Sequence, residues 1–433
     1  MIVWLVKLEE PIPQLDSSRP YRMSMLASAL VERGHEVVRW CSDFDHLNKR
    51  RYENVFGEDV GGLYRRVLVN KNYRLNLLSS CVDYDKPVSF KRLLNNTITQ
   101  HSFRKGAAHE ASPDLIICSM PTPGMAYLSS RIARRVGAAF VLDARDMWPD
   151  ILQSELHGIK KILAYPLILT MRRQLKYASK AADACLGITE FFVDFLIAHA
   201  DRRRGALDKS FALGFKDQRE EFDEELALNY WHKKGVNLDS DTKFIYFAGR
   251  LNKTVFNAID PVIGAAKELQ NKKRNVKFVF CGSGQYADAV KNKCISLANM
   301  VFVGEIPPEN LQILRQNSVA AIQPIENRKD YLNSLSNKFF ESISAGLPVL
   351  TSLSGLTRDV VNENQCGLIY DSDNELYTAV SRLCQDDVLR LNLATNARSL
   401  FLSKFESSLI YGSYAEHLEL ILETSMIRDH GLD

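Results

Sequence analysis

The chain has 433 residues, more than one hydrophobic core usually serves, so two domains are expected. Its apolar fraction of 46%, charged fraction of 25% and net charge of +3 are those of an ordinary soluble globular protein. No apolar run approaches the roughly 18 residues that span a bilayer, and the opening segment, Met1 to Leu8, is too short for a signal peptide. We therefore expect a cytoplasmic protein rather than a membrane-spanning one.

The eight cysteines form no Cys-x-x-Cys pair and lie mostly in apolar surroundings. We expect buried, reduced thiols rather than disulfide bridges, redox centres or zinc ligands.

Charge is distributed unevenly along the chain. Residues 1–215 contain 31 Lys and Arg against 23 Asp and Glu, a balance of +8, whereas the remainder contains 24 against 29, a balance of −5. The stretch from Lys160 to Lys180 holds six cations and no acidic residue, interleaved with apolar side chains. It predicts either contact with an anionic membrane surface or a solvated helix face. Nucleic acid is not expected as a partner, because no binding motif accompanies the charge.

The first half of the chain alternates apolar strands with helices. A strand over Ile2 to Val6 leads through a polar loop into a helix from about Tyr21 to Arg33, and Gly34 ends this helix before a strand from Glu36 to Cys41. Such a βαβ unit opens a parallel sheet. Further strands are predicted at Leu115 to Ser119, Ala139 to Asp143 and Ala184 to Ile188.

A second alternation follows a polar region between Ala212 and Thr242. Strands are predicted at Lys243 to Ala248, Val276 to Cys281, Val301 to Val303 and Val319 to Gln323, with helices at Pro261 to Leu269, Tyr286 to Leu297 and Pro308 to Arg315. The sequence thus predicts an α/β protein of two Rossmann-like, doubly wound domains facing a central cleft. We expect an N-terminal domain at 1–215, a linker region at 216–242, a second domain at 243–404 and a bracing helix at 405–433.

The segment from Asn333 to Leu350 reads as loop, helix and strand. Ser334 or Ser336 can cap the helix, Phe339, Phe340 and Ile343 form its apolar face, and Gly346 is the expected left-handed stop.

The start of this helix, Asn333 to Lys338, offers unpaired backbone N–H groups and the positive end of the helix dipole, which suit an anionic ligand. Glu341 lies about a turn and a half inside, where a carboxylate can accept hydrogen bonds from two neighbouring hydroxyls, such as those of a ribose. The alternative is a Lys338/Glu341 surface pair at i,i+3.

Two glycine-containing strand ends add candidate phosphate contacts. Arg250 follows its strand through Gly249 and suits a bidentate phosphate contact, with Lys253 as a second cation three residues on; a structural ion pair is the alternative. Gly282 and Gly284 end the next strand just before a helix, where small residues would let backbone N–H groups reach a phosphate or nucleobase.

In the first half, the segment from Asp143 to Asp150 leaves a buried strand and breaks at Pro149. We expect Asp143, Arg145 and Asp146 to converge on the cleft, with Asp146 as the functional member, a carboxylate that orients a sugar hydroxyl. The alternative for Asp143 is a structural pair with Arg145.

In order and spacing, these motifs resemble glycosyltransferase family 4, the retaining "group 1" transferases of GT-B fold. The resemblance rests on Ser18-Arg19-Pro20, Arg145-Asp146-Met147-Trp148-Pro149, Gly249-Arg250, Gly282-Ser283-Gly284, Asn337-Lys338-Phe339-Phe340-Glu341 and Ala345-Gly346-Leu347-Pro348-Val349. The "RDxWP" and "NKxFE" forms look most like the branch that builds bacterial O-antigen, capsule and exopolysaccharide.

The resemblance implies metal-independent transfer of a sugar, with retention, from a nucleoside-diphosphate sugar to a glycan or polyprenyl-diphosphate-linked acceptor, without a cofactor. A UDP-sugar is the expected donor. The resemblance implies that the domain at 243–404 binds this nucleotide-sugar and that the domain at 1–215 binds the acceptor. It also implies that Glu341 contacts the ribose, but the family's first glutamate, eight residues earlier, is here Asn333, and the usual lysine after the Gly-Arg pair is displaced.

These considerations define the predicted site. Its catalytic members are Asp146, Arg250 and Asn333, and its donor-binding members are Arg250, Lys253, Gly282, Gly284, Ser334, Ser336, Lys338 and Glu341, with no metal. Two alternatives stay open: a nucleotide-sugar epimerase or hydrolase of the same fold, and a non-catalytic nucleotide-sugar-binding subunit.

Overall fold

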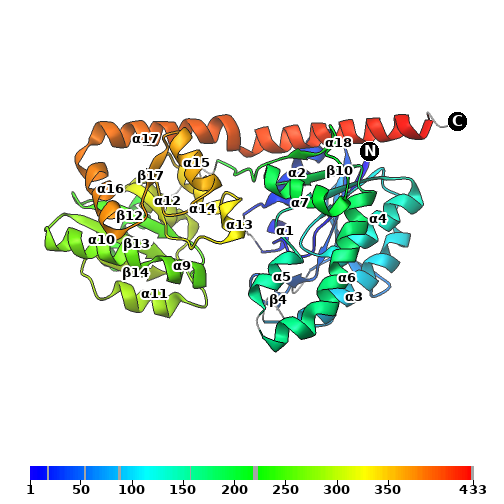
Figure 1. Ribbon diagram of the computed structural model, residues 1–433, viewed down its shortest axis with the longest axis horizontal. Helices are drawn as coiled ribbons and strands as arrows, with labels where there is room; N and C mark the ends of the chain where they lie inside the picture. Colours follow the sequence, from blue (N-terminus) through cyan, green and yellow to red (C-terminus); the bar gives the residue numbers. More distant parts are fainter. Residues whose placement is uncertain (17–18, 53–54, 86–88, 157, 218–222, 431–433) are drawn as a thin grey trace. The chain divides into compact units, whose positions relative to one another are not determined.

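The computed structural model describes residues 1–16, 19–52, 55–85, 89–156, 158–217 and 223–430. Ser18 of the Ser18-Arg19-Pro20 motif lies outside the described residues. The chain divides into two compact units (Figure 1): unit 1 comprises Met1–Ala212 and Ser407–Asp433, and unit 2 comprises Leu213–Glu406. The chain therefore leaves unit 1 after Ala212 and returns to it at Ser407.

Unit 1 contains a nine-stranded sheet in the order β11-β10-β9-β8-β1-β2-β7-β6-β5. All its neighbouring strands are parallel except the pairs β7/β6 and β6/β5. The strands are β1 (Ile2–Val6), β2 (Glu36–Ser42), β5 (Glu58–Val60), β6 (Tyr64–Asn70), β7 (Tyr73–Leu78), β8 (Leu115–Ser119), β9 (Ala139–Ala144), β10 (Ala184–Gly187) and β11 (Lys209–Ser210), with a separate pair β3 (Phe44–Asp45) and β4 (Arg50–Arg51). The helices are α1 (Pro13–Asp16), α2 (Arg22–Glu32), α3 (Phe90–Gly106), the short η1 (Ala107–His109), α4 (Pro123–Val136), α5 (Asp150–Glu155), α6 (Ile159–Ala181), α7 (Glu190–Ala200) and α18 (Ser407–His430).

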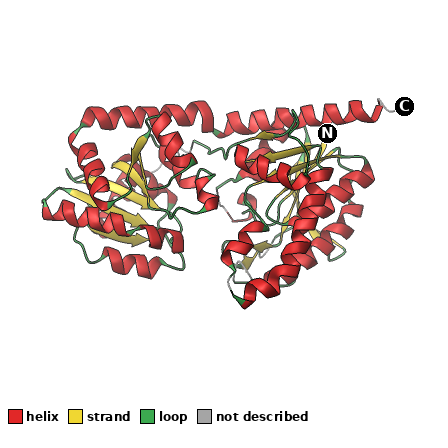
Figure 2. Ribbon diagram, viewed as in Figure 1, coloured by secondary structure: helices red, strands yellow, loops and turns green. Residues whose placement is uncertain are grey.

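The alternation of side chains along β1 buries both faces of this sheet. Val3 and Leu5 join a core with α2 and α18, which includes Leu26 and Leu418. Trp4 faces the other way, and its ring lies 5.2 Å from that of Trp40. Burial on both faces is expected of a parallel sheet covered by helices, and Figure 2 shows this arrangement in each unit.

Unit 2 contains a six-stranded, fully parallel sheet in the order β14-β13-β12-β15-β16-β17. The strands are β12 (Lys243–Ala248), β13 (Val276–Cys281), β14 (Met300–Gly304), β15 (Ser318–Gln323), β16 (Val349–Thr351) and β17 (Gly367–Ile369). The helices are α8 (Glu224–Lys233), α9 (Lys253–Ala258), α10 (Asp260–Asn271), α11 (Ala287–Cys294), α12 (Pro308–Gln316), α13 (Lys329–Leu332), α14 (Asn337–Ser344), α15 (Leu356–Glu363), α16 (Asp373–Gln385) and α17 (Asp387–Leu400), which continues into the π-helix η2 (Phe401–Phe405).

Both sheets are doubly wound, as the strand pattern predicted. Strand order reverses between β1 and β8 in unit 1 and between β12 and β15 in unit 2. In open α/β sheets, ligands bind outside the carboxyl ends of the strands at such reversal points. The residues that follow these four strands are therefore the first place to look for a site.

Part of the expected linker, 216–242, belongs to the core of unit 2. Asp223 caps α8 by accepting a hydrogen bond from the Leu226 backbone at 2.9 Å. Trp231 of this helix is fully buried, and its Nε1 donates to the Asn310 carbonyl at 2.9 Å. Residues 218–222 lie outside the described part of the chain.

The last helix, α18, packs on unit 1. Tyr414 stacks on Phe211 with 4.5 Å between ring centroids and an interplanar angle of 2°. Tyr411, Leu418 and Ile421 are also buried in the unit 1 core.

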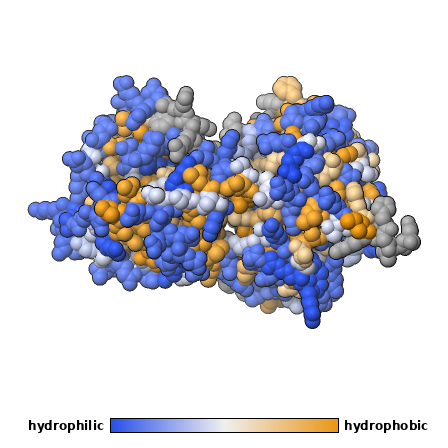
Figure 3. Space-filling model, turned by 90° about the horizontal axis from the view of Figure 1, so that it is seen from above, coloured by the Kyte–Doolittle hydropathy of each residue, from blue (hydrophilic) through white to orange (hydrophobic). Residues whose placement is uncertain are grey.

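The face of the molecule seen in Figure 3 is largely hydrophilic, with apolar residues scattered over it.

Candidate functional site

Helix α14 begins and ends as its sequence predicts. Of the two candidate caps, Ser336 accepts a hydrogen bond from the Phe339 backbone at 3.2 Å. Phe339, Phe340 and Ile343 are buried, and Gly346 follows the helix with a φ of 70°. Ser334 instead donates its hydroxyl to the Asp330 carbonyl at 2.8 Å, so it stabilises the end of α13.

Lys338 and the loop after β12 lie in direct contact. A Cβ added to Gly249, whose φ is 150°, would lie 2.2 Å from Cε of Lys338, so the end of the lysine side chain lies against this glycine. The ammonium of Lys338 lies 5.4 Å from the centroid of the Phe247 ring. Arg250 is exposed next to this contact, and Lys253 is exposed at the first position of α9. The structure thus brings Lys338 to the Gly249-Arg250 turn at the strand reversal of unit 2.

Gly282 and Gly284 bring two loops together. The Gly249 backbone donates to the Cys281 carbonyl at 3.0 Å, and the Leu251 backbone to the Ser283 carbonyl at 2.9 Å. A Cβ on Gly282 would lie 1.9 Å from the Gly249 carbonyl oxygen, and one on Gly284 would lie 2.5 Å from that of Leu251. The packing of these loops therefore already requires both glycines, whatever ligand the loops contact.

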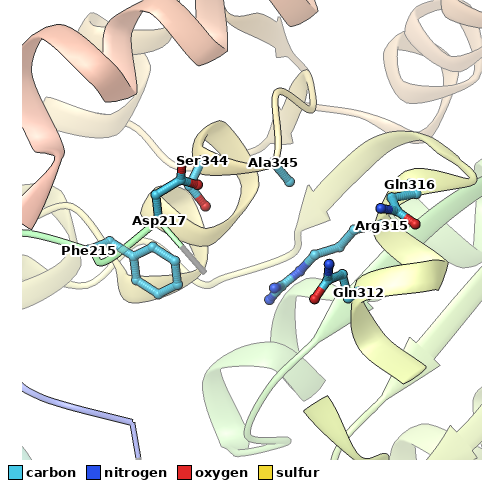
Figure 4. Close-up of a pocket in the computed structure, with 7 residues that line it drawn as sticks. All are labelled: Phe215, Asp217, Gln312, Arg315, Gln316, Ser344 and Ala345. Atoms are coloured by element: carbon cyan, nitrogen blue, oxygen red, sulfur yellow. The ribbon is translucent and has the colours of Figure 1, made fainter. Parts of the chain in front are cut away.

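Glu341 pairs with an arginine that sequence reasoning missed. Arg315 of α12 donates from Nη2 to Oε2 of Glu341 at 3.1 Å, and both side chains are 18% exposed. Arg315 also lines a pocket of about 300 Å³ beside Ser344 and Ala345, at the end of α14 remote from its cap. In Figure 4 its side chain extends into this pocket, opposite Phe215 and Asp217. Arg315 thus orients the carboxylate of Glu341.

Asn333 stands just after α13. Its side-chain nitrogen donates to the Lys329 carbonyl at 2.8 Å, so the side chain closes the last turn of that helix. A carboxylate cannot donate this bond, so the residue at this position performs a task that glutamate could not.

Gln323 ends β15, next to the cap of α14. It is 1% exposed and accepts a hydrogen bond at 3.4 Å from the Ser336 hydroxyl. Its Nε2 is buried and has no hydrogen-bond partner among the described residues. A buried amide donor without an acceptor is costly. Its place as the last residue of a strand at the reversal point was the signal that sequence reasoning passed over.

In unit 1, Asp146 lies in a polar pocket of about 370 Å³ at the reversal between β1 and β8. The side chains that line it include Lys7, Glu9, Glu10, His46, Arg92, Arg145 and Trp148. Except for Arg145 and Trp148, these neighbours were missed, although Lys7, Glu9 and Glu10 directly follow the first strand.

Charge pairing organises this pocket. Arg92 contacts Glu9 at 3.1 Å, and Arg145 pairs with Glu10. Burial alone would raise the pKa of Glu9, but Lys7 and Arg92 hold it below its ordinary value. Burial lowers the pKa of Lys7 and raises that of Asp146, although Lys7 opposes the second shift. Burial thus raises the pKa of Asp146, whereas the cations around Glu9 and Glu10 hold the pKa of each of those carboxylates below its ordinary value.

The expectation that Asp143 joins Arg145 and Asp146 in the site is wrong, and so is its alternative, a pair with Arg145. Asp143 is fully buried and forms two hydrogen bonds with Arg22, at 2.8 and 3.1 Å. The reason is geometric: Asp143 is on β9 and points into the core beneath α2, whereas Arg145 follows the strand and reaches the pocket. Asp143 is thus a structural residue.

The cations of α6 are partly neutralised by neighbouring elements, which the sequence stretch alone did not show. Arg172 pairs with Asp150 at 2.8 Å, and Lys176 and Lys180 lie 3.7 and 3.8 Å from Asp201. The apolar side chains Ile159, Ile162, Leu163 and Tyr165 near the start of α6 are more than half exposed. None of the helices in the described ranges has both the length and the hydropathy needed to cross a bilayer.

Comparison with known proteins gives a consistent result for both units. Residues 21–207 match the family model "Glycosyl transferase 4-like domain", and residues 231–400 match "Glycosyl transferases group 1". No curated protein matches the chain in sequence.

Solved structures of similar fold span the whole chain. Sucrose-phosphate synthase from Thermosynechococcus elongatus superimposes with a TM-score of 0.67 at 13% identity, over 98% of this chain and 99% of that one. WaaG, a glycosyltransferase involved in lipopolysaccharide biosynthesis, gives 0.61 at 15% identity, over 96% and 99%. Anabaena HepE, solved in complex with UDP-glucose, gives 0.59 at 12% identity, over 97% and 99%.

Proposed function

Since the chain is a group 1 glycosyltransferase of GT-B fold, we propose that it transfers a sugar, with retention and without a metal, from a UDP-sugar to a glycan or lipid-linked acceptor in bacterial surface polysaccharide synthesis. The observation that carries this proposal is the contact of Lys338 with the Gly249-Arg250 turn at the strand reversal of unit 2.

The donor binds to unit 2 in this proposal. A departing diphosphate must be neutralised, and Arg250, Lys338 and the backbone N–H groups at the start of α14 supply positive charge for that task. Glu341, oriented by Arg315, accepts hydrogen bonds from the ribose hydroxyls. The buried amide of Gln323 offers a further donor beside the cap of α14. HepE, a protein of similar fold, was solved with UDP and with UDP-glucose, which supports a UDP-sugar as donor.

The acceptor binds to the polar pocket of unit 1. Paired carboxylates and cations around Trp148 suit a polyhydroxylated ligand, because each sugar hydroxyl can both donate and accept. Asp146, whose pKa burial raises, is placed to take the proton of the attacking hydroxyl. The role of WaaG in lipopolysaccharide biosynthesis supports an acceptor from surface polysaccharide assembly.

A thermal-shift panel of UDP-, GDP- and dTDP-sugars tests the donor. A ligand that binds only the folded protein raises its Tm, so we expect the UDP compounds to give the largest shift. Arg250→Ala should abolish the shift, whereas Arg382→Ala, which removes an exposed arginine of α16, should leave it unchanged. A larger shift with a GDP-sugar would overturn the donor assignment.

Asn333 favours one alternative, a subunit that binds the donor without transferring it, because it replaces the family's first glutamate and is engaged with α13. The two functions differ in product formation. Mass spectrometry after incubation with UDP-sugar and lipid-linked acceptor should detect the glycosylated acceptor, and Asp146→Asn should reduce its rate at least about 100-fold. Donor binding without product from any acceptor would favour the binding subunit, and release of UDP without acceptor would favour a hydrolase.

We further propose that the start of α6 contacts an anionic membrane surface from the cytoplasmic side. Exposed Ile162, Leu163 and Tyr165 beside Lys161 have the composition of an interfacial helix. Sedimentation with anionic vesicles at low salt should pellet the protein, and Ile162→Ser/Leu163→Ser should prevent it. Equal pelleting with neutral and anionic vesicles would contradict the electrostatic part of this proposal.

A further inference from the structure

A second cavity in unit 1 lies at the opposite ends of the strands from the Asp146 pocket. It has a volume of about 700 Å³ and is bordered by the end of α3, by η1 and by α4. Ser112 and Pro113, which line it, precede β8, so it opens at the amino ends of the strands. The cavity is therefore separate from both strand-reversal sites.

Four arginines line this cavity: Arg104 of α3 and Arg131, Arg134 and Arg135 of α4. No acidic residue is among the lining residues. All four are exposed, and in the described ranges none of them forms an ion pair, although Arg131 donates to the Tyr127 hydroxyl at 2.9 Å. Three other arginines of unit 1 have carboxylate partners: Arg66 and Arg74 share Glu110, and Arg202 pairs with Asp208.

The spacing on α4 is unfavourable without a counter-charge. Arg131 lies three and four residues before Arg134 and Arg135, and like charges at these spacings destabilise a helix by about 0.2–0.5 kcal/mol per pair. The helix dipole favours cations in the last turn and so accounts for Arg134 and Arg135 singly. It does not explain why arginines from two different helices border the same cavity.

The inner wall of the cavity is aromatic. Trp4 lines it and is 1% exposed, and its Nε1 is buried without a hydrogen-bond partner among the described residues. Tyr127 and Tyr177 add their rings, with 5.1 Å between centroids. Leu128, Ile132 and Val136 make the α4 side partly apolar. A ligand in this cavity therefore meets exposed cations and an apolar wall.

We propose that this arginine-lined cavity binds an organic phosphate with an apolar portion. The phosphate contacts Arg131, Arg135 and their neighbours, and the apolar portion lies against Trp4 and the tyrosines. The same chemistry belongs to a phospholipid headgroup region and to a soluble phosphate ester. The site is independent of donor binding by unit 2.

The four tryptophans allow the sites to be distinguished in the full-length protein. Labelled with 5-fluorotryptophan, Trp4 reports on this cavity, Trp148 on the Asp146 pocket and Trp231 on the core of unit 2. Titration with phenyl phosphate should shift the fluorine resonance of Trp4 at concentrations where inorganic phosphate, which lacks the apolar portion, gives a smaller shift. Resonances are assigned with single Trp→Phe variants.

Arg131→Gln/Arg135→Gln should weaken phenyl phosphate binding at least about tenfold, since each lost charge-assisted contact weakens binding about this much. The matched control is Lys71→Gln/Arg203→Gln, which removes two exposed cations of unit 1 that do not line the cavity. Unchanged circular dichroism and Tm in both variants would show that folding is intact. The control should bind like wild type.

Vesicles of phosphatidylcholine with and without phosphatidylglycerol distinguish the two sources of phosphate. If the cavity variant alone loses binding to phosphatidylglycerol vesicles, the natural ligand is a lipid; if vesicle binding is unchanged while phenyl phosphate binding is lost, it is a soluble ester. The proposal is overturned if phenyl phosphate leaves Trp4 unshifted, or if the cavity variant binds phenyl phosphate as tightly as the control.

Discussion

Arg22 and Asp143 show how one buried contact decides between a structural and a functional role. Both side chains are fully buried, and Arg22 also donates to the Phe211 carbonyl at 2.8 Å. The sequence placed Asp143 beside Arg145 because they are neighbours in the chain. The fold separates their side chains, since Asp143 points into the core and Arg145 lines the polar pocket.

Removing one partner of this buried ion pair should lower the stability of the fold. Asp143→Asn leaves the Arg22 charge buried without its counter-charge, so we expect the free energy of unfolding to fall by about 3–5 kcal/mol. Urea denaturation measures the loss. Asp387→Asn, which removes the 80% exposed partner of Arg390, is the control and should have a much smaller effect. Equal losses in the two variants would contradict the distinction.

His46 makes stability depend on pH. Burial, with Arg92, lowers its pKa from 6.5 to about 4, so the folded protein keeps it neutral where the unfolded chain is protonated. Between these values the unfolded state binds more protons, and stability therefore falls as pH decreases from about 6.5 to 4.

The His46 contribution can be isolated with His46→Gln. Denaturation at pH 7.5 and pH 4.5 should show that the variant loses about 2 kcal/mol less than wild type over this interval. The hydrogen bond between His46 Nδ1 and the Tyr84 hydroxyl, at 2.8 Å, is tested by Tyr84→Phe. Identical pH dependence in wild type and His46→Gln would show that His46 titrates normally in the fold.

At the scale of elements, α14 was the most predictable part of the candidate site. Its cap, its apolar face and Gly346 are all local signals, so they can be recognised in one segment of sequence. The partners of that helix were not predictable. Arg315 reaches Glu341 from α12, and Lys338 of α14 lies against Gly249, which follows β12. Such contacts depend on packing between distant segments.

The antiparallel strands β5, β6 and β7 were not predicted, for a related reason. The segment from Glu58 to Leu78 is rich in polar and basic residues, and β6 alternates buried and exposed positions only weakly. Its arginines are accommodated because Glu110, far along the chain, accepts from Arg66 and Arg74. The sequence of the strands alone therefore does not reveal that a distant carboxylate neutralises their arginines.

The cap of α14 gives a test at this scale. Ser336→Ala removes the acceptor of the Phe339 N–H, and the loss of an N-cap typically costs about 1 kcal/mol. Because this helix start is the proposed diphosphate site, the KM for the donor should also rise. Ser334→Ala, two residues earlier, should leave KM near the wild-type value. A similar KM in all three proteins would contradict a role for the start of α14 in donor binding.

At the scale of the whole molecule, the sequence predicted the two doubly wound sheets correctly because periodic strands and helices carry that information locally. Unit 2 is continuous in sequence and has its own core. We therefore expect residues 213–406, expressed alone, to unfold cooperatively and to bind UDP-sugar within about tenfold of the full-length affinity. Calorimetry checks both points. Loss of donor binding in a folded fragment would place part of the donor site in unit 1.

Unit 1 lacks this independence. A fragment of residues 1–212 should aggregate, because α18 contributes Tyr411, Tyr414, Leu418 and Ile421 to its core. Joining 1–212 to 407–430 through a flexible linker should restore a soluble fold, which size-exclusion chromatography would detect. A monomeric, cooperatively folded 1–212 fragment would show that the helix is dispensable.

The return of the chain to unit 1 at Ser407 also has a consequence for synthesis in the cell. A ribosome makes the first half of this protein long before it makes the segment that completes its core. While unit 2 is translated, the apolar surface of the N-terminal half that α18 later covers stays exposed. The core of this half can therefore be completed only after unit 2 has been synthesised, and a truncated product that ends before the last helix leaves apolar surface exposed for chaperones and proteases to recognise.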